Sequence, residues 1–240
     1  MQYADLHHHV IYGVDDGPQT FEDAQNMLRR AHENGITDIA ATSHATPGRH
    51  RFPMDTYLEH LRREQAWADE QGLGIRLHTG CEILYTDETA RLLQSGEIPT
   101  IDGTRLILVE FLPANDFRHI ENAVRRLGNA GYTVIVAHAE RYEGTRRVED
   151  LLTLREELGA YIQINARTFI SPGGFLSSTR RWLKKVMENG CCDLAATDAH
   201  NVSSRPCLMR KCHETIAKEW GRDTADRLCA ETPRQLLEIE

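Results

Sequence analysis

Strand-like and helix-like segments alternate along the whole of this 240-residue chain, and this alternation constrains the fold more than any other feature. Short apolar runs, typical of buried strands, are followed by segments with helical periodicity. The expected strands are 3–9, 37–44, 75–83, 105–111, 133–140, 161–165 and 192–200. Such a pattern predicts a parallel sheet covered by helices.

The expected helices lie between these strands or follow them. The first begins at Thr20, whose spacing to Asp23 is that of a capping box, and it ends at Gly35. The helices are expected at 20–35, 55–71, 116–130, 147–158, 176–189 and 206–219. No linker or repeat of fixed period interrupts the series. The sequence therefore predicts a single α/β domain over 1–240, built either as an open sheet or as a closed barrel.

Composition restricts the class of partner. The net charge of −8 disfavours nucleic acid, because binding to it depends on Lys and Arg neutralising phosphates. No segment approaches the ~20 apolar residues that span a bilayer, and the N-terminus lacks a signal pattern. We therefore expect a cytoplasmic protein that does not insert into membranes. The six cysteines form no CxxC pair and are expected to be reduced thiols.

Six of the seven expected strands end in side chains that ligate hard or borderline metal ions. These are His7 and His9, His44, Glu82, Glu110, His138, and Asp198 with His200. Asp15 and Asp16 follow shortly after the first strand. Each residue alone could be an ordinary loop or core residue, but their shared position is not expected by chance. In a closed barrel these strand ends would meet around one mouth.

The three consecutive histidines of the first strand have different predicted roles. Side chains alternate along a strand, so His7 and His9 share a face while His8 points the other way and is expected to be structural. Five histidines and four or five carboxylates exceed the needs of one ion. Imidazole and carboxylate without thiolate suit Mn, Fe or Zn. We therefore expect several ions, with a carboxylate bridging two of them and a metal-bound hydroxide as nucleophile.

Six motifs occur in order over residues 5–206: "DLHHHVIYGVDDGP", "ATSHATPG", "GCEI", "VEF", "AHAERY" and "TDAHN" followed by "RP". Together they resemble the PHP (polymerase and histidinol phosphatase) superfamily. Within it, the chain resembles the CpsB-type bacterial manganese-dependent protein tyrosine phosphatases of capsule and exopolysaccharide systems. The resemblance implies a distorted (β/α)7 TIM-like barrel. It also implies three divalent ions at the C-terminal ends of the strands, Mn²⁺ before Fe or Zn.

The resemblance implies a role for each matched residue. The first ion would be held by His7, His9, Glu82 and Asp198, the second by Glu82, Glu110 and His138, and the third by Asp15, His44 and His200. Asp16 would support these ligands from outside the coordination spheres. Arg141 and Arg205 match positions that clamp the substrate phosphate. The implied substrate is a phosphotyrosyl protein, a bacterial tyrosine autokinase that controls polysaccharide synthesis.

Alternative functions remain open at this point. Histidinol phosphate phosphatases share nearly all of this metal chemistry, although Glu110 and the "DDGP" turn argue against that activity. A metal-dependent nuclease would also use a His-x-His pair, and the acidic charge argues mildly against it. A metal-binding module without activity is the third alternative. A cysteine-dependent phosphatase is excluded, because no cysteine is followed by Arg six positions later.

Overall fold

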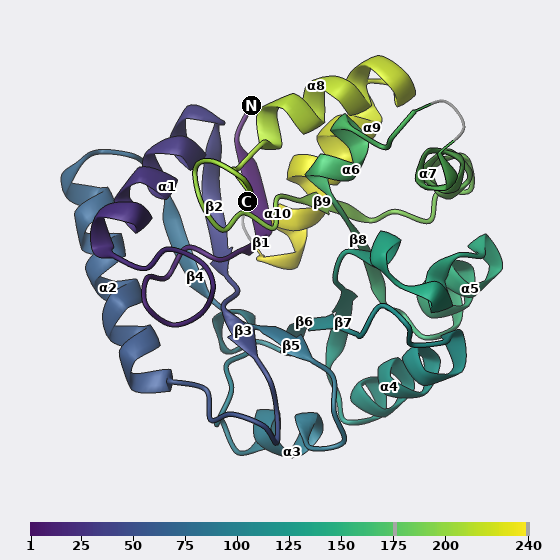
Figure 1. Cartoon of the computed structure of the whole chain (residues 1–240), viewed down its shortest axis with the longest axis horizontal. Helices are drawn as coiled ribbons and strands as arrows, with labels where there is room; N and C mark the ends of the chain where they lie inside the picture. The colour runs from purple at the N-terminus through teal and green to yellow at the C-terminus, as the bar shows by residue number, and fades with distance from the viewer. Residues whose placement is uncertain (175–176, 239–240) are drawn as a thin grey trace.

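The computed structural model describes residues 1–174 and 177–238, and its strands pair in parallel. The strands are β1 (Tyr3–His8), β2 (Ile36–Ala41), β3 (His44–Ala45), β4 (Arg76–Thr79), β5 (Glu82–Leu84), β6 (Leu106–Glu110), β7 (Thr133–Val136), β8 (Tyr161–Asn165) and β9 (Leu194–Ala196). They form two sheets, ordered β1-β2-β4 and β3-β5-β6-β7-β8-β9. Helices lie around the outside of the strands (Figure 1). The α/β class with parallel sheets is confirmed.

The helices follow the expected alternation. They are α1 (Phe21–Glu33), α2 (Met54–Glu70), α3 (Thr89–Gln94), α4 (Phe117–Asn129), α5 (Val148–Leu152), α6 (Ala166–Ile170), α7 (Ser178–Glu188), α8 (Met209–Trp220), α9 (Arg222–Asp226) and α10 (Thr232–Leu236). The six expected helices correspond to α1, α2, α4, α5, α7 and α8, and π-helical turns continue α5. The capping box at Thr20 is present. Residue 176 of the expected helix and residues 239–240 of the expected domain lie outside the described residues.

Two expected strands are each divided by a break. The segment 37–44 forms β2 and β3, and the segment 75–83 forms β4 and β5. The breaks lie side by side, because β2 pairs with β4 while β3 pairs with β5. Tyr57 of α2 connects the two breaks: its hydroxyl donates to the Ala41 carbonyl at 2.7 Å and accepts from the Gly80 amide at 2.9 Å. The sequence pattern did not predict this division.

The first and last strands also lie next to each other. The Asp198 amide donates to the His7 carbonyl at 2.8 Å, and the His9 amide donates to the Ala199 carbonyl at 2.9 Å. These hydrogen bonds bring the C-terminal ends of β1 and β9 together, although the two strands are far apart in the sequence. Within the described residues, no helix is long and apolar enough to cross a membrane.

A small apolar cluster, separate from the larger hydrophobic core, lies among the strands. It consists of Leu6, Ala40, Ile101, Leu106, Leu108, Ile135, Ala137 and Leu194. Side chains two positions apart on a strand share a face, so Leu106, Leu108 and Glu110 of β6 point the same way. On β6, the apolar side chains of this cluster are therefore followed on the same face by the ligand-type residue Glu110. All six cysteines are free and buried, as expected.

A second network of charged groups surrounds His78 of β4 and includes none of the candidate metal ligands. Its Nε2 is 3.2 Å from Asp38 Oδ1, and its Nδ1 is 2.5 Å from Asp102 Oδ2. Arg234 also contacts Asp38, at 3.2 Å. Burial disfavours protonation of His78, but the carboxylates of Asp102 and Asp38 outweigh it and raise its pKa to about 9. His78 is therefore charged at neutral pH.

Replacing His78 with Gln should remove a pH-dependent contribution to stability. Because the folded-state pKa is raised, that contribution is complete below the unfolded pKa near 6.5 and is lost as the pH rises through about 9. We expect the wild type to be more stable by about 1–2 kcal/mol at pH 6, allowing for solvent screening of Asp102. Urea denaturation at pH 6 and pH 9.5 measures this difference. An equal difference at both pH values would contradict the assignment.

Candidate metal centre

Glu82, at the start of β5, lies at the centre of the strand-end residues. The residue is 1% exposed, and four histidines surround its carboxylate. Oε1 is 2.7 Å from His138 Nε2 and 3.2 Å from His7 Nε2. Oε2 is 3.1 Å from His44 Nδ1 and 3.3 Å from His9 Nε2. A carboxylate with histidines on both oxygens has the position required to bridge two ions.

The ligand-type residues form four overlapping groups. Within each group, one ligand atom per residue lies within 4.8 Å of the others. The groups are His7, His9 and Asp198; His7, Glu82 and His138; His44, Glu82 and Glu110; and His9, Asp16, His44 and His200. Shared residues join the four groups into one cluster. These groups contain every expected ligand except Asp15.

Asp15 and Asp16 occupy different places. Asp15 Oδ2 accepts from the His44 amide at 3.0 Å and lies 2.8 Å from His9 Nδ1, an arrangement that orients the His9 ring. Asp16 Oδ1 instead lies 3.2 Å from His200 Nε2 and 3.4 Å from His44 Nε2. The carboxylate of Asp16, rather than that of Asp15, therefore faces the imidazole rings of His44 and His200. Sequence order alone could not distinguish two adjacent aspartates on a loop.

The electrostatics of the cluster suit divalent cations. Burial would raise the pKa of Glu82, but His7 and His138 hold it well below its ordinary range. Burial lowers the pKa of His7, yet Glu82 and Asp198 outweigh it and raise the pKa to about 9. The ionised carboxylates thus draw positive charge into a buried site. Metal ions can supply that charge in place of protons, and the nitrogen and oxygen donors fit Mn, Fe or Zn.

Three residues that the sequence did not single out hydrogen-bond to the candidate ligands. The Gln163 side chain accepts from the His138 amide at 2.7 Å, and Asn165 Nδ2 donates to Asp198 Oδ2 at 2.8 Å. The Tyr142 hydroxyl lies 2.8 Å from His138 Nδ1. Gln163 and Asn165 sit at alternate positions of the otherwise apolar β8, so they share a face. That pattern could have indicated their role.

The backbone is strained at two of the candidate ligands. His138 has φ +28° and Asp198 has φ +52°, in the left-handed region that non-glycine residues rarely adopt. Such strain persists only where the surroundings fix the conformation, and it is concentrated at functional sites. Here the hydrogen bonds of Gln163 and Asn165 supply that constraint.

The model of the family described as "Capsular polysaccharide synthesis, CpsB/CapC" matches residues 3–238. The chain belongs to the CpsB/CapC family. It is 30% identical over 237 residues to the tyrosine-protein phosphatase CpsB of Streptococcus pneumoniae, covering 97% of each chain. It is 26% identical over 219 residues to the tyrosine-protein phosphatase YwqE of Bacillus subtilis, covering 91% of this chain and 85% of that one.

Solved structures agree with this membership. A crystal structure matches with a TM-score of 0.82 at 26% identity. It belongs to a study of YwqE from Bacillus subtilis and CpsB from Streptococcus pneumoniae, described there as unique metal-dependent tyrosine phosphatases. The match covers 99% of this chain and 92% of that one. A histidinol phosphate phosphatase from Lactococcus lactis matches with a TM-score of 0.61 at 14% identity, over 97% and 98% of the chains. That second match shows the fold alone.

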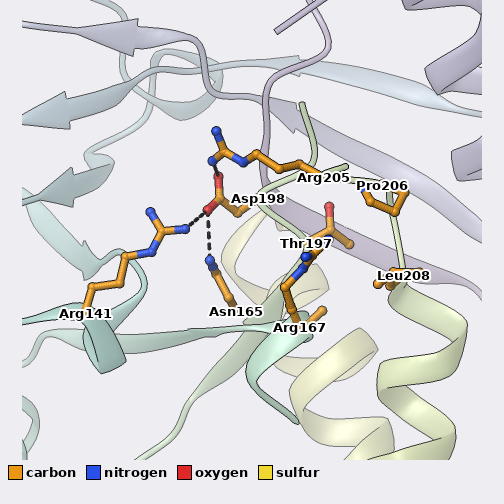
Figure 2. A pocket seen from close by; sticks show the side chains of 9 residues that line it. Arg141, Asn165, Arg167, Thr197, Asp198, Arg205, Pro206 and Leu208 are labelled. Atoms are coloured by element: carbon orange, nitrogen blue, oxygen red, sulfur yellow. Dashed lines mark hydrogen bonds and ion pairs between the residues drawn. The ribbon is translucent and has the colours of Figure 1, made fainter. Parts of the chain in front are cut away.

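Two arginines of this CpsB/CapC chain face the cluster. Arg141 and Arg205 both bind the carboxylate of Asp198 (Figure 2). Arg205 Nη1 is also 3.3 Å from Asp16 Oδ2. Their side chains are 42% and 36% exposed. They border a cavity of about 200 Å³, lined by Arg141, Asn165, Ala166, Arg167, Thr197, Asp198, Arg205, Pro206 and Leu208. Guanidinium groups at an open cavity beside ligand-type residues can bind an anionic substrate.

Proposed function

We propose that this protein is a metal-dependent protein tyrosine phosphatase, which hydrolyses phosphotyrosine as a phosphoric monoester. One observation carries the proposal: a buried cluster of histidines and carboxylates centred on Glu82 opens beside Arg141 and Arg205, in a chain of the CpsB/CapC family. The Streptococcus pneumoniae and Bacillus subtilis relatives, both named tyrosine-protein phosphatases, support the substrate class. The alternative of histidinol phosphate has only a likeness of fold behind it.

We infer that the cluster binds three divalent ions and that the metal is Mn²⁺. The residues that would hold them are His7, His9, Asp198 and Glu82 for the first ion, Glu82, Glu110 and His138 for the second, and Asp16, His44 and His200 for the third. Asp16 replaces Asp15 in this set, because Asp16 lies beside His44 and His200 while Asp15 orients His9.

The chemistry follows from the demands of phosphoryl transfer, which needs charge neutralisation and positioning more than covalent catalysis. When bound, divalent ions neutralise phosphate charge and lower the pKa of water. Arg141 and Arg205 exchange the Asp198 carboxylate for phosphate oxygens, and their planar forks fix the orientation of the ester. The phenol of tyrosine has a pKa of ~10, so the phenolate can leave from phosphorus without a dedicated general acid.

We also infer that the seven strand positions close into a distorted (β/α)7 barrel of one domain. The divided strands β2/β3 and β4/β5 each count once, and β1 is hydrogen-bonded beyond β9 through His9 and Ala199. Closure would place the ends of all seven strands around Glu82. This inference explains why ligands from such distant segments meet at one site.

The physiological substrate that we propose is a phosphotyrosyl protein of polysaccharide assembly, a tyrosine autokinase. The family description and the names of the relatives support this class of partner. The exposed arginines at an open cavity would admit a phosphotyrosine carried on a protein chain.

Removal and restoration of metal tests the function. After treatment with chelator, we expect phosphate release from a phosphotyrosyl peptide to stop and to return on addition of Mn²⁺. A phosphoseryl peptide of the same sequence and histidinol phosphate serve as control substrates. Faster turnover of histidinol phosphate would replace the proposed substrate but keep the metal centre. Unchanged activity after verified loss of metal would contradict the proposal.

A further inference from the structure

His8 is a buried histidine that belongs to none of the ligand groups around Glu82. It lies on β1 between His7 and His9, its exposed fraction is 0%, and neither ring nitrogen has a hydrogen-bond partner among the described residues. A buried polar group without a partner costs about 1–3 kcal/mol. Native structures contain few such groups, and each requires an explanation.

A carboxylate and a thiol lie beside this histidine. One ligand atom each of Asp5, His8 and Cys207 lies within 4.8 Å of the other two, and all three residues are buried. The irregular pairing of β1 and β2 accounts for this arrangement, since Asp5 pairs with Ile39 and His8 with Ala41. The extra residue of this β-bulge allows side chains three positions apart to approach each other.

The carboxylate of Asp5 is already oriented. Oδ1 accepts from the Thr197 amide at 3.0 Å, and Oδ2 accepts from the Thr197 hydroxyl. A ligand whose own supporting hydrogen bonds are in place loses little freedom when it binds an ion. Cys207 lies on the segment between Arg205 and α8. The group of Asp5, His8 and Cys207 therefore joins β1 near the N-terminus to a segment about 200 residues later in the chain.

We propose that Asp5, His8 and Cys207 form a further metal site, distinct from the centre around Glu82, for a thiophilic divalent ion such as Zn²⁺. Thiolate and imidazole are ligands that zinc prefers, with bonds of about 2.0–2.3 Å. One carboxylate and one thiolate balance the charge of the ion, and neutral imidazole adds none. Binding forms the metal–sulfur bond as the thiol releases its proton to water.

The cavity beside the arginines is lined by neighbours of this site. Cys207 stands between Pro206 and Leu208, which both line the cavity, and Thr197 lines it as well (Figure 2). Once bound, an ion would fix the segment that carries Arg205 to β1. The site therefore acts on the position of a phosphate-binding arginine, without contacting the substrate.

Cobalt substitution tests the proposal with a signal that the main centre cannot give. Co²⁺ bound to a thiolate has a sulfur-to-metal charge-transfer band in the near ultraviolet, and the ligands proposed around Glu82 include no thiol. We expect the metal-stripped protein to develop this band on titration with Co²⁺ alone. The band should be lost in Cys207→Ser and weakened or lost in His8→Asn, and it should persist in Cys191→Ser, which removes another buried thiol.

Zinc stoichiometry gives a second measurement. After equilibration with Zn²⁺ and gel filtration, Cys207→Ser should retain one zinc equivalent fewer per chain than the wild type or Cys191→Ser. Absence of the cobalt band in the wild-type protein would overturn the proposal. This test requires no variant, so its outcome does not depend on whether Cys207→Ser folds. A band that persists in folded Cys207→Ser would also overturn it. Neither result would bear on phosphatase activity, which the proposed function tests separately.

Discussion

Replacing Glu82 with Gln is expected to lower kcat/KM for a phosphotyrosyl peptide by about 100–1,000-fold. The substitution retains the shape of the side chain but removes the charge that four histidines surround. Loss of Lewis-acid stabilisation costs several kcal/mol, and each 1.36 kcal/mol is about a tenfold change in rate. Metal retained after gel filtration should fall as well, because Glu82 belongs to two of the ligand groups.

Glu64→Gln is the matched control for this experiment. Glu64 is also a buried glutamate, but it lies on α2, and its Oε1 accepts from the Tyr12 amide at 3.1 Å. Burial raises the pKa of Glu64 well above its ordinary range, which favours the neutral form, and Gln is close to isosteric with that form. We expect Glu64→Gln to keep activity and bound metal. Activity of Glu82→Gln near that of the wild type, at full folding, would refute the ligand assignment.

The sequence predicted which ligand-type residues gather at the strand ends better than it predicted where each side chain points. Strand ends are visible as apolar runs, and ligand-type residues at such ends meet whenever parallel strands lie side by side. His44 and Glu82 could therefore be placed in one cluster from their positions alone. Asp15 and Asp16 could not, since they lie on an irregular loop where the direction of each side chain depends on tertiary contacts. The hydrogen bond of Asp15 to the His44 amide is one such contact.

The divided strands show a similar limit. An apolar pattern over 37–44 or 75–83 indicates an extended segment, but it does not indicate where that segment changes partner. The change depends on Tyr57, a residue of α2 that contributes two hydrogen bonds from outside the sheet. Its helical periodicity marks it only as a core residue. Short helices such as α3 and α6 were missed because they are too brief to show a period.

Tyr57→Phe should destabilise the protein by about 2–4 kcal/mol. Phenylalanine would fill the same volume, but it would leave the Ala41 carbonyl and the Gly80 amide without their partner at a buried site. Each unsatisfied buried group costs about 1–3 kcal/mol. Burial raises the pKa of the Tyr57 phenol, so its hydroxyl is protonated and can both donate and accept. A loss of this size is a large fraction of the ~5–15 kcal/mol that stabilises a typical domain.

Urea denaturation measures this loss as a lower midpoint at an unchanged slope. Tyr132→Phe is the matched control: Tyr132 is 6% exposed, and Arg105 lies over its ring at 5.3 Å, a contact that Phe retains. We expect that control to cost less than about 1 kcal/mol. Equal effects in the two variants would show that the strand breaks do not depend on the Tyr57 hydroxyl. A loss specific to Tyr57→Phe would show that one helix residue fixes the segments that carry His44 and Glu82 into the site.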